Sequence, residues 1–288
     1  MDCGYTFRRE HRRVFDRRYS TSYLLDGSSF RRLATRWGVG IMTAWRRVQK
    51  SLRRVVVGEV VFLPCPPGVR VILLDGKHVR FAHRPWTFYA AIDGHTGQPL
   101  GWILLPRSEL RAGYDALLMH LASEGVTPLA FVSDWHIGIR AAVAAHFPNA
   151  VHQRCAAHVL QDVLRKLGGV RFLSTTIGRT HWQAVRSLAL SYGNVDRARE
   201  RLIVLQEQFP SLHRGLRVLR RMLPDIYQFA IKKQVNIPRT SNRIENFMGF
   251  LEQRLKTMRG VKVPENYITL ISQLIFLKWK KSKRPTNK

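Results

Sequence analysis

Acidic residues are scarce in this chain of 288 residues, where Asp and Glu together number 19 against 48 Lys and Arg. The formal net charge is therefore +29, and self-repulsion of that size opposes a compact fold unless a polyanion offsets it. Nucleic acid is the favoured partner, because its phosphates attract Lys and Arg. A protein of membrane surfaces would also be basic, but it would usually carry an amphipathic anchor.

Cysteine and long apolar runs are also scarce. The three cysteines, Cys3, Cys65 and Cys155, form no closely spaced framework, which argues against a disulfide scaffold and for a reducing compartment. The start, MDCGYTFRREHRR, has no apolar signal region, and the stretch YITLISQLIFLKW is too short and too polar to span a bilayer. Because 45 % of the residues are hydrophobic, we expect a globular protein. The lack of a signal region and of a membrane-spanning stretch predicts a cytoplasmic protein, and the basic charge predicts association with the nucleoid.

Residues 1–63 are predicted to be a DNA-binding region, made of a basic arm and a helix-turn-helix. Apolar residues recur at helical spacing from Phe30 to Trp37, and Gly38 interrupts the run. A second run has its apolar side at Ile41, Ala44, Trp45 and Val48. Two short helices joined by a glycine-containing turn are typical of a helix-turn-helix, although an ordinary helical hairpin has the same pattern. The basic residues of the second helix that we expect to contact DNA are Arg46, Arg47 and Lys50.

Beyond a PCPPG linker, the pattern predicts an α/β domain. Strands are expected at 69–75, 86–93, 99–106, 129–133 and 149–153, with helices at 114–122, 137–147 and 155–167. Three hairpin-linked strands followed by two strands linked through helices make a mixed five-stranded sheet with flanking helices, in the strand order of the ribonuclease H fold. Residues 169–239 are basic and predict an all-helical insertion, so the ribonuclease H-like domain would comprise 69–168 and 240–288.

Three acids, each with an ordinary alternative reading, are candidates for a metal site. Asp75 precedes Gly76, as in a hairpin turn, and Asp134 could cap the helix that follows it. Glu245, three residues after Asn242, could complete a capping box.

Taken together, the acids favour a metal site over the three separate alternatives. The strands predicted to end at Asp75 and Asp134 are expected neighbours, and the helix of Glu245 could pack across the same sheet edge. Oxygen ligands suit hard divalent cations, and two such ions about 4 Å apart can act on both oxygens of a phosphoryl displacement. We therefore expect two Mg²⁺ or Mn²⁺ ions held by these acids, with Glu252 as the alternative to Glu245.

Cys155 and His158 form a Cys-x-x-His pair with two interpretations. Two ligands make half of a zinc site, and no second close pair completes it. The other interpretation is a buried cysteine beside a hydrogen-bonded histidine.

Three segments resemble the bacterial Mutator-type insertion-sequence transposases. These are LLDGKHVR (73–80), SDWHIGIRAAVAAHFPNAVHQRCAAHVLQDVLRKL (133–167) and TSNRIENFMGFLEQRLKTMRG (240–260). The resemblance implies a DDE catalytic domain, in which Asp75, Asp134 and Glu245 are the metal ligands, and a helical insertion before the glutamate. It also implies metal-dependent cleavage and strand transfer of an insertion sequence.

Further residues are expected around this centre. The resemblance places Cys155 and His158 near the active site, where they would support a ligand or contact DNA. The residues expected beside the acids are His136, Asn242 and Arg243, and those expected to neutralise DNA phosphates are Arg254, Lys256 and Arg259. One departure is that Trp135 follows the second aspartate, where the family usually has a small residue.

Two other functions stay open at this point. A ribonuclease H-like nuclease or resolvase would cleave without strand transfer, and a transposase-derived regulator would bind DNA without chemistry. Joining two DNA ends would require at least a homodimer.

Overall fold

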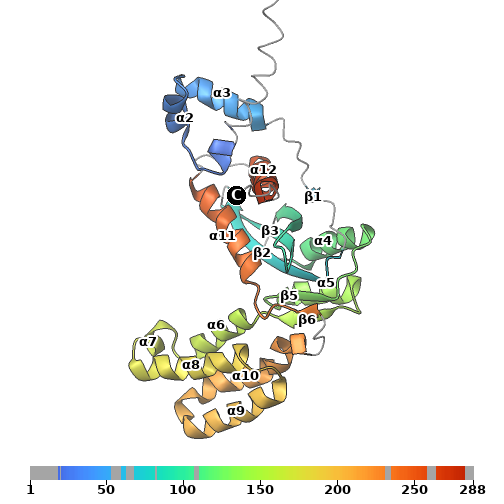
Figure 1. Ribbon diagram of the computed structural model, residues 1–288, viewed down its shortest axis with the longest axis vertical. Helices are drawn as coiled ribbons and strands as arrows, with labels where there is room; N and C mark the ends of the chain where they lie inside the picture. Colours follow the sequence, from blue (N-terminus) through green and yellow to red (C-terminus); the bar gives the residue numbers. More distant parts are fainter. Residues whose placement is uncertain are drawn as a thin grey trace, which may run out of the picture.

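The computed structural model describes residues 19, 21–52, 60–62, 68–81, 83–106, 110–230, 235–257 and 264–282. They form an α/β fold with a mixed sheet at the centre of an elongated molecule (Figure 1). Helices α2 (Phe30–Arg36) and α3 (Ile41–Leu52) lie at one end of the long axis, and a group of helices lies at the other. This group comprises α7 (Val170–Leu173), α8 (Thr176–Leu190), α9 (Val195–Gln208) and α10 (His213–Ile226).

The sheet has the strand order β1-β4-β3-β2-β5-β6. The strands are β1 (Val60–Phe62), β2 (Val71–Phe81), β3 (Arg84–Asp93), β4 (Pro99–Pro106), β5 (Ala130–Ser133) and β6 (Val151–Arg154). Strands β1 to β4 pair antiparallel, whereas β5 pairs parallel with both β2 and β6. The predicted meander, the predicted crossover through helices and the pairing of the first and fourth predicted strands are confirmed.

The sheet differs from the prediction at its edge. A sixth strand, β1, pairs with β4, although the sequence analysis placed residues 60–62 in the N-terminal region. Three residues are too few to show the alternation that identifies a strand.

Strand β2 is also longer than predicted. It does not end at Asp75 but continues to Phe81, with Asp75 opposite Ala90 and Gly76 opposite Tyr89 of β3. The chain reverses only beyond Phe81, where His83 has a φ of 65°. The Asp-Gly pair therefore lies within a long antiparallel ladder and makes no turn, so that alternative is wrong.

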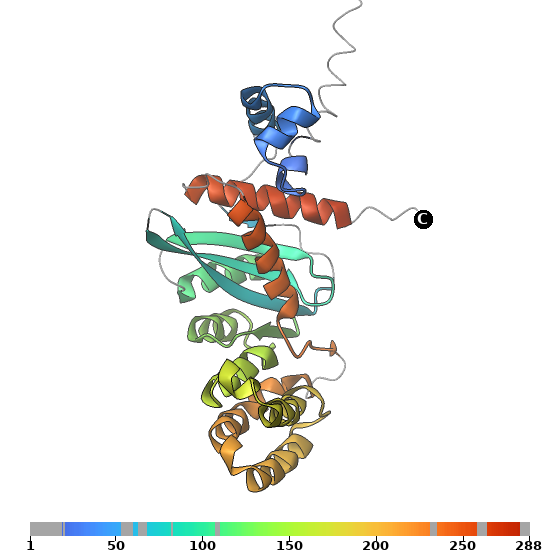
Figure 2. The same ribbon diagram turned by 90° about the vertical axis from the view of Figure 1, so that its left-hand side faces the viewer.

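Two helical layers cover the sheet. One face packs against α4 (Arg111–Ser123) and α5 (Ile137–His146). The other face packs against α11 (Asn242–Thr257) and α12 (Pro264–Ser282), as Figure 2 shows, and the N-terminal helices belong to the same apolar core. A hydrogen bond of 2.8 Å from the indole of buried Trp102 to the Ser272 hydroxyl connects the sheet to α12.

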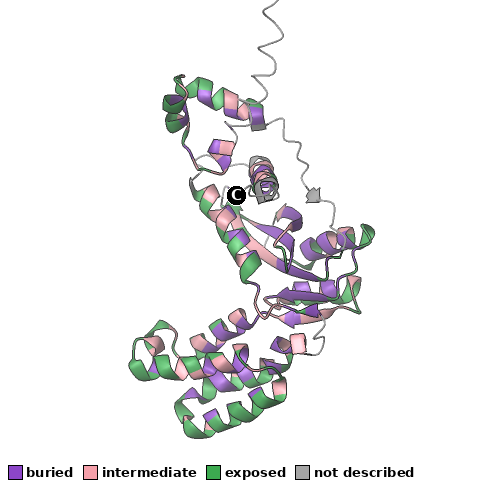
Figure 3. Cartoon of the chain, in the orientation of Figure 1, coloured by how far each residue is buried: buried purple, intermediate pink, exposed green. Residues whose placement is uncertain are grey.

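The helical insertion has its own core. Apolar side chains of α8, α9 and α10 pack together with those of α6 (Ala156–Lys166), a helix predicted to belong to the sheet domain. Buried Gln153 of β6 connects this core to the sheet: its amide donates to the Ile226 carbonyl at 2.7 Å, and it accepts from the Phe229 N–H at 2.9 Å. In Figure 3 buried residues concentrate in the strands, while the outward sides of α8 to α10 are exposed. The predicted boundaries of the regions stay predictions.

Helices α2 and α3 are joined by a turn in which Gly38 has a φ of 57°. Ala34 is buried against this turn, as expected for a close contact between helices. The predicted apolar face of α3 is half wrong, because Ala44 and Val48 are buried whereas Ile41 and Trp45 are 49 % and 40 % exposed.

Two short 3₁₀ turns complete the described elements, η1 (Pro210–Leu212) and η2 (Gln228–Ala230). Within the described ranges, no helix has both the length and the apolar character needed to cross a membrane.

Candidate active site

Asp75 and Asp134 lie at corresponding positions just beyond the paired part of two adjacent parallel strands. Val71 pairs with Ala130 and Leu73 with Val132, so Asp75 and Asp134 each follow the last paired residue of their segment by two positions. Strand β5 ends one residue before Asp134, while β2 runs on beyond Asp75. The two carboxylates therefore lie where the parallel pairing of β2 with β5 ends and β2 continues without β5 beside it.

The same register fixes the face of the sheet on which these acids lie. Because side chains alternate along a strand, Asp75 shares its face with Val71 and Leu73, which belong to the core beneath α11 and α12. Helix α11 contacts β2 and carries Glu245 in its first turn. Asp75 therefore lies on the sheet face that α11 covers, and Glu245 lies in the first turn of that helix.

The backbone is unusual immediately after Asp134. Trp135 has a φ of 75°, a left-handed conformation that costs a non-glycine residue about 1–3 kcal/mol. Asp134 Oδ1 accepts a hydrogen bond of 2.9 Å from the His136 N–H, and His136 Nδ1 in turn accepts from the Gly138 N–H at 3.3 Å. The cap of α5 is thus His136, and the alternative of Asp134 as the cap is wrong.

The ring of Trp135 lies between two side chains. The Arg140 guanidinium is 5.1 Å from the ring centroid, and the His152 ring is 4.6 Å away on an adjacent strand. These contacts hold the strained residue in place. His152 also contacts the Ser133 hydroxyl at 2.8 Å, and its pKa is lowered to about 4 by burial and by Arg140.

Glu245 is oriented by the residue that precedes its helix. The Ser241 hydroxyl donates to Glu245 Oε1 at 2.7 Å, and the Ser241 carbonyl accepts from the N–H groups of Ile244 and Glu245. Asn242 is the first helical residue, so the predicted capping box centred on Asn242 is wrong. Asn242 and Arg243 are exposed on this first turn.

Cys155 and His158 meet the same carboxylate. One ligand atom each from Cys155, His158 and Glu245 lies within 4.8 Å of the other two. His158 Nδ1 is 3.7 Å from Glu245 Oε1, and the Ser241 N–H donates to the Cys155 sulfur at 3.2 Å. The pair therefore lies beside Glu245, and its predicted place near an active site stays a prediction.

The charges of this cluster depend on one another. The Cys155 side chain is the main cause that raises the pKa of His158 to about 9, against the effect of burial, and Glu245 and Asp134 add to it. Burial alone would raise the pKa of the Cys155 thiol, but the neighbouring His158 imidazole and the hydrogen bond from Ser241 lower it below its usual value. At neutral pH these effects favour an imidazolium beside acidic groups.

The three acids do not all converge in this structure. Among the described residues, the only set of three Asp, Glu, His or Cys side chains at mutual ligand distance is Cys155, His158 and Glu245. Asp134 is near enough to influence His158, whereas Asp75 accepts a hydrogen bond of 2.9 Å from the Gly76 N–H.

Comparison with known families identifies the family of the chain. The profile of the family described as "Transposase, Mutator family" matches residues 92–261, which is more than half of the chain. The chain belongs to the Mutator family of transposases. A comparison with curated proteins gives no significant match.

The basic residues predicted to bind DNA divide into exposed and internally bound groups. In this transposase Arg46 and Lys50 are exposed on α3, whereas Arg47 donates to the Tyr19 hydroxyl at 2.6 Å. Arg254 donates to the Leu25 carbonyl, which connects α11 to the N-terminal residues. Lys256 pairs with Glu252. Arg259 lies outside the described residues.

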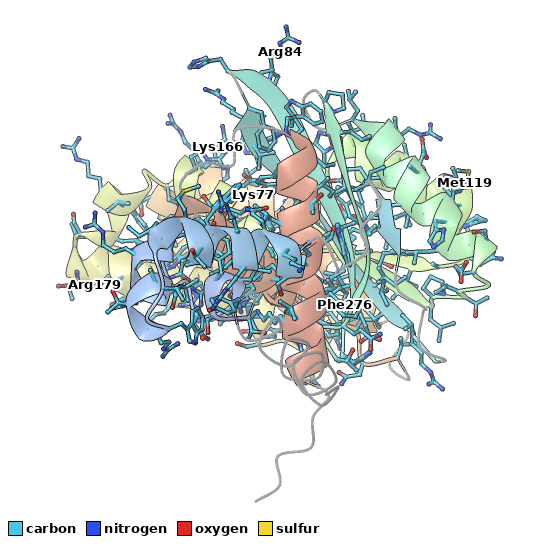
Figure 4. The ribbon with its side chains drawn as sticks, turned by 90° about the horizontal axis from the view of Figure 1, so that it is seen from above. Lys77, Arg84, Met119, Lys166, Arg179 and Phe276 are labelled. Atoms are coloured by element: carbon cyan, nitrogen blue, oxygen red, sulfur yellow. The ribbon has the colours of Figure 1, made fainter. Side chains whose placement is uncertain are left out.

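Glu252, the alternative to Glu245, is engaged elsewhere. The ammonium groups of Lys77 and Lys256 each lie 2.8 Å from one of its oxygens, and Lys77 is marked in Figure 4. These lysines, Lys256 first, lower the pKa of Glu252 to about 2. A carboxylate held by two cations is a poor candidate for a metal ligand.

Ser241 is a residue of the candidate site that the sequence analysis did not name. It contacts both Cys155 and Glu245, and it precedes the helix that the sequence analysis took to be capped by Asn242.

Proposed function

We propose that this Mutator-family chain is a DDE transposase that cuts DNA at the ends of an insertion sequence and joins the freed ends to target DNA. The observation that carries the proposal is the parallel pairing of β2 with β5, in which Asp75 and Asp134 each follow the last paired residue by two positions, while the helix of Glu245 contacts β2. A strand order of three antiparallel strands followed by two parallel ones supports a ribonuclease H-like catalytic domain.

The donor chemistry of the acids fits hard divalent cations. Asp75, Asp134 and Glu245 offer oxygen donors, which Mg²⁺ and Mn²⁺ prefer, and we propose that they would hold two such ions. When bound, the ions supply Lewis-acid activation of the attacking oxygen and charge stabilisation at the leaving oxygen. Because Glu245 Oε1 accepts from Ser241 in this structure, the glutamate would have to turn toward the aspartates on binding.

The reaction needs no covalent enzyme intermediate. Water attacks a phosphodiester at the element end and releases a 3′-hydroxyl, which then attacks a phosphodiester of the target. Each step exchanges one P–O bond for another.

The chain's own residues would position the DNA. Arg46 and Lys50 on α3 would bind phosphates through the helix-turn-helix, and Arg243 would do so beside Glu245. Joining two ends in one complex would need at least two copies of the chain.

The experiment is an assay of purified protein with end-labelled element DNA, target DNA and Mg²⁺. Strand-transfer products support the proposal. Nicks without joining would indicate a nuclease or resolvase, and a mobility shift without cleavage would indicate a DNA-binding regulator; either result would overturn it.

A further inference from the structure

Three chemically different donors meet beside the proposed catalytic centre. Cys155 is the N-cap of α6 and His158 lies one turn further along, so both point from one side of that helix. Glu245, from the first turn of α11, completes a group whose ligand atoms all lie within 4.8 Å of one another. The Cys-x-x-His spacing offers two possible zinc ligands. The fold brings a third, Glu245, to them from 87 residues further along the chain than His158.

The group is partly buried and has unused donor capacity. Cys155 is a free cysteine with 0 % of its surface exposed. Nδ1 of His158 is also buried and, within the described part of the chain, has no partner in hydrogen-bond geometry. Its nearest charged neighbour is Glu245 Oε1, at 3.7 Å. A buried imidazole nitrogen without a partner is costly, and a bound cation would satisfy it.

Ser241 supports two of the three donors. Its N–H donates to the Cys155 sulfur at 3.2 Å and its hydroxyl donates to Glu245 Oε1 at 2.7 Å. Such outer contacts orient metal ligands and tune their basicity, and their loss typically weakens a metal site 10–100-fold. The N–H of Ala156, next to Cys155, is itself bonded to the Arg239 carbonyl at 2.9 Å, which fixes the start of α6 against the segment that carries Ser241.

We propose that Cys155, His158 and Glu245 form a Zn²⁺-binding site separate in chemistry from the hard-cation site of the aspartates. A thiolate and an imidazole select Zn²⁺ over Mg²⁺, and three protein ligands leave a fourth position open. Binding of the ion would displace the proton of His158, and a thiolate, a carboxylate and the resulting neutral imidazole carry two negative charges, which match the charge of the ion.

Because the Zn²⁺ site and the proposed Mg²⁺ site both use Glu245, Zn²⁺ binding should affect activity. Zn²⁺ would hold the carboxylate that the proposed function assigns to Mg²⁺, so micromolar Zn²⁺ should inhibit Mg²⁺-dependent DNA cleavage. This consequence, unlike the binding itself, rests on the proposed function.

The binding test uses a protein in which Cys155 is the only thiol. Cys3→Ser and Cys65→Ser together leave Cys155 alone, since the chain has three cysteines. Co²⁺ replaces Zn²⁺ as a spectroscopic probe, because a thiolate ligand gives a near-ultraviolet charge-transfer band that histidine and carboxylate sites lack. We expect one equivalent of Co²⁺ per chain to produce this band and Zn²⁺ to displace it.

Variants with matched controls assign the ligands. Glu245→Gln and Ser241→Ala should each weaken Co²⁺ binding about tenfold or more. Glu252→Gln, which changes the same side chain two turns along α11, should leave the affinity unchanged, and circular dichroism checks that each variant is folded.

Absence of the charge-transfer band in the single-thiol protein, or an unchanged affinity in Glu245→Gln, would overturn the proposal. Binding is measured without DNA, so a failure of the cleavage assay leaves this result intact. Zn²⁺ binding without inhibition of an active enzyme would instead contradict the assignment of Glu245 to the cleavage centre.

Discussion

His152 is half-buried and contacts Ser133 and Trp135, and its low pKa makes folding sensitive to acid. Its pKa is lowered from 6.5 to about 4 in the folded chain, so the unfolded chain binds more protons between these values. The stability contributed by neutral His152 is therefore complete above pH 6.5 and is lost as the pH falls from 6.5 toward 4.

We predict that the free energy of unfolding falls by up to about 3 kcal/mol over this pH range because of this residue. His152→Gln should be less stable at pH 7 but should show a shallower fall between pH 7 and pH 4, measured by urea unfolding at each pH. Parallel profiles for the two proteins would contradict the assignment.

Gly113 tests the packing between α4 and the sheet. A Cβ at this position would lie 2.3 Å from Cζ of Tyr89, whose hydroxyl accepts from the Leu110 N–H at 2.8 Å. Gly113→Ala should therefore destabilise the protein by about 1–3 kcal/mol, because the buried ring has to move.

Gly249 is the matched control on α11. A Cβ there meets nothing within 4 Å, so Gly249→Ala should stabilise the protein by up to about 1 kcal/mol through helix propensity. Denaturant unfolding compares the two variants. A neutral Gly113→Ala would show that the helix is not packed as closely as described.

At the scale of elements, α3 carries the charges most accessible to DNA. Arg46 and Lys50 are exposed, whereas Arg47 is bound to Tyr19. If each of the two contacts one phosphate, the double variant Arg46→Ala/Lys50→Ala should reduce the slope of log affinity against log salt by about 1.8. Fluorescence anisotropy with duplex DNA measures this slope.

Arg199→Ala is the control for that measurement. Arg199 is paired with Asp196 at 3.3 Å on α9, at the opposite end of the molecule, so its loss should leave the slope nearly unchanged. Equal effects of the two changes would indicate that DNA binding depends on total charge and not on α3.

Elements with strong local patterns could be predicted, and those without could not. The apolar run of β5 was placed within one residue of its observed start, and its neighbour β2 followed from the strand order. Strand β1 is defined by its pairing with β4 and not by its own three residues. Helix α12 is apolar around most of its circumference, as suits a helix between the sheet and the N-terminal helices, so helical periodicity did not identify it.

The candidate site likewise contains features that could be predicted from the sequence and features that could not. The sequence predicted that Asp75 and Asp134 follow neighbouring strands, because the order of hairpins and helical crossovers indicates which strands pair. It could not predict that Ser241 joins Cys155 to Glu245, since these contacts depend on where the chain returns after the helical insertion. The ion pair of Glu252 with Lys77, which makes Glu252 a poor candidate for a metal ligand, could not be predicted either, because Lys77 lies on β2, far away in the sequence.

At the scale of the whole molecule, the net charge and the elongated shape favour a long polyanion as the binding partner. The net charge of +29 is distributed over a long body with the N-terminal helices at one end and the helical insertion at the other (Figures 1 and 2). The tip of the β2–β3 hairpin adds another basic projection at Arg84, which points away from the body in Figure 4. A polyanion that contacts several of these parts would reduce their mutual repulsion.

The most direct test is DNA cleavage by single-acid variants in Mg²⁺. Asp75→Asn, Asp134→Asn and Glu245→Gln should each lower the cleavage rate about 10²-fold or more, because each would remove a proposed metal ligand and with it several kcal/mol of transition-state stabilisation. DNA affinity should be unchanged, and Glu252→Gln should cleave at nearly the wild-type rate. Full activity in any of the first three variants, or its loss in Glu252→Gln alone, would contradict the assignment of the catalytic acids.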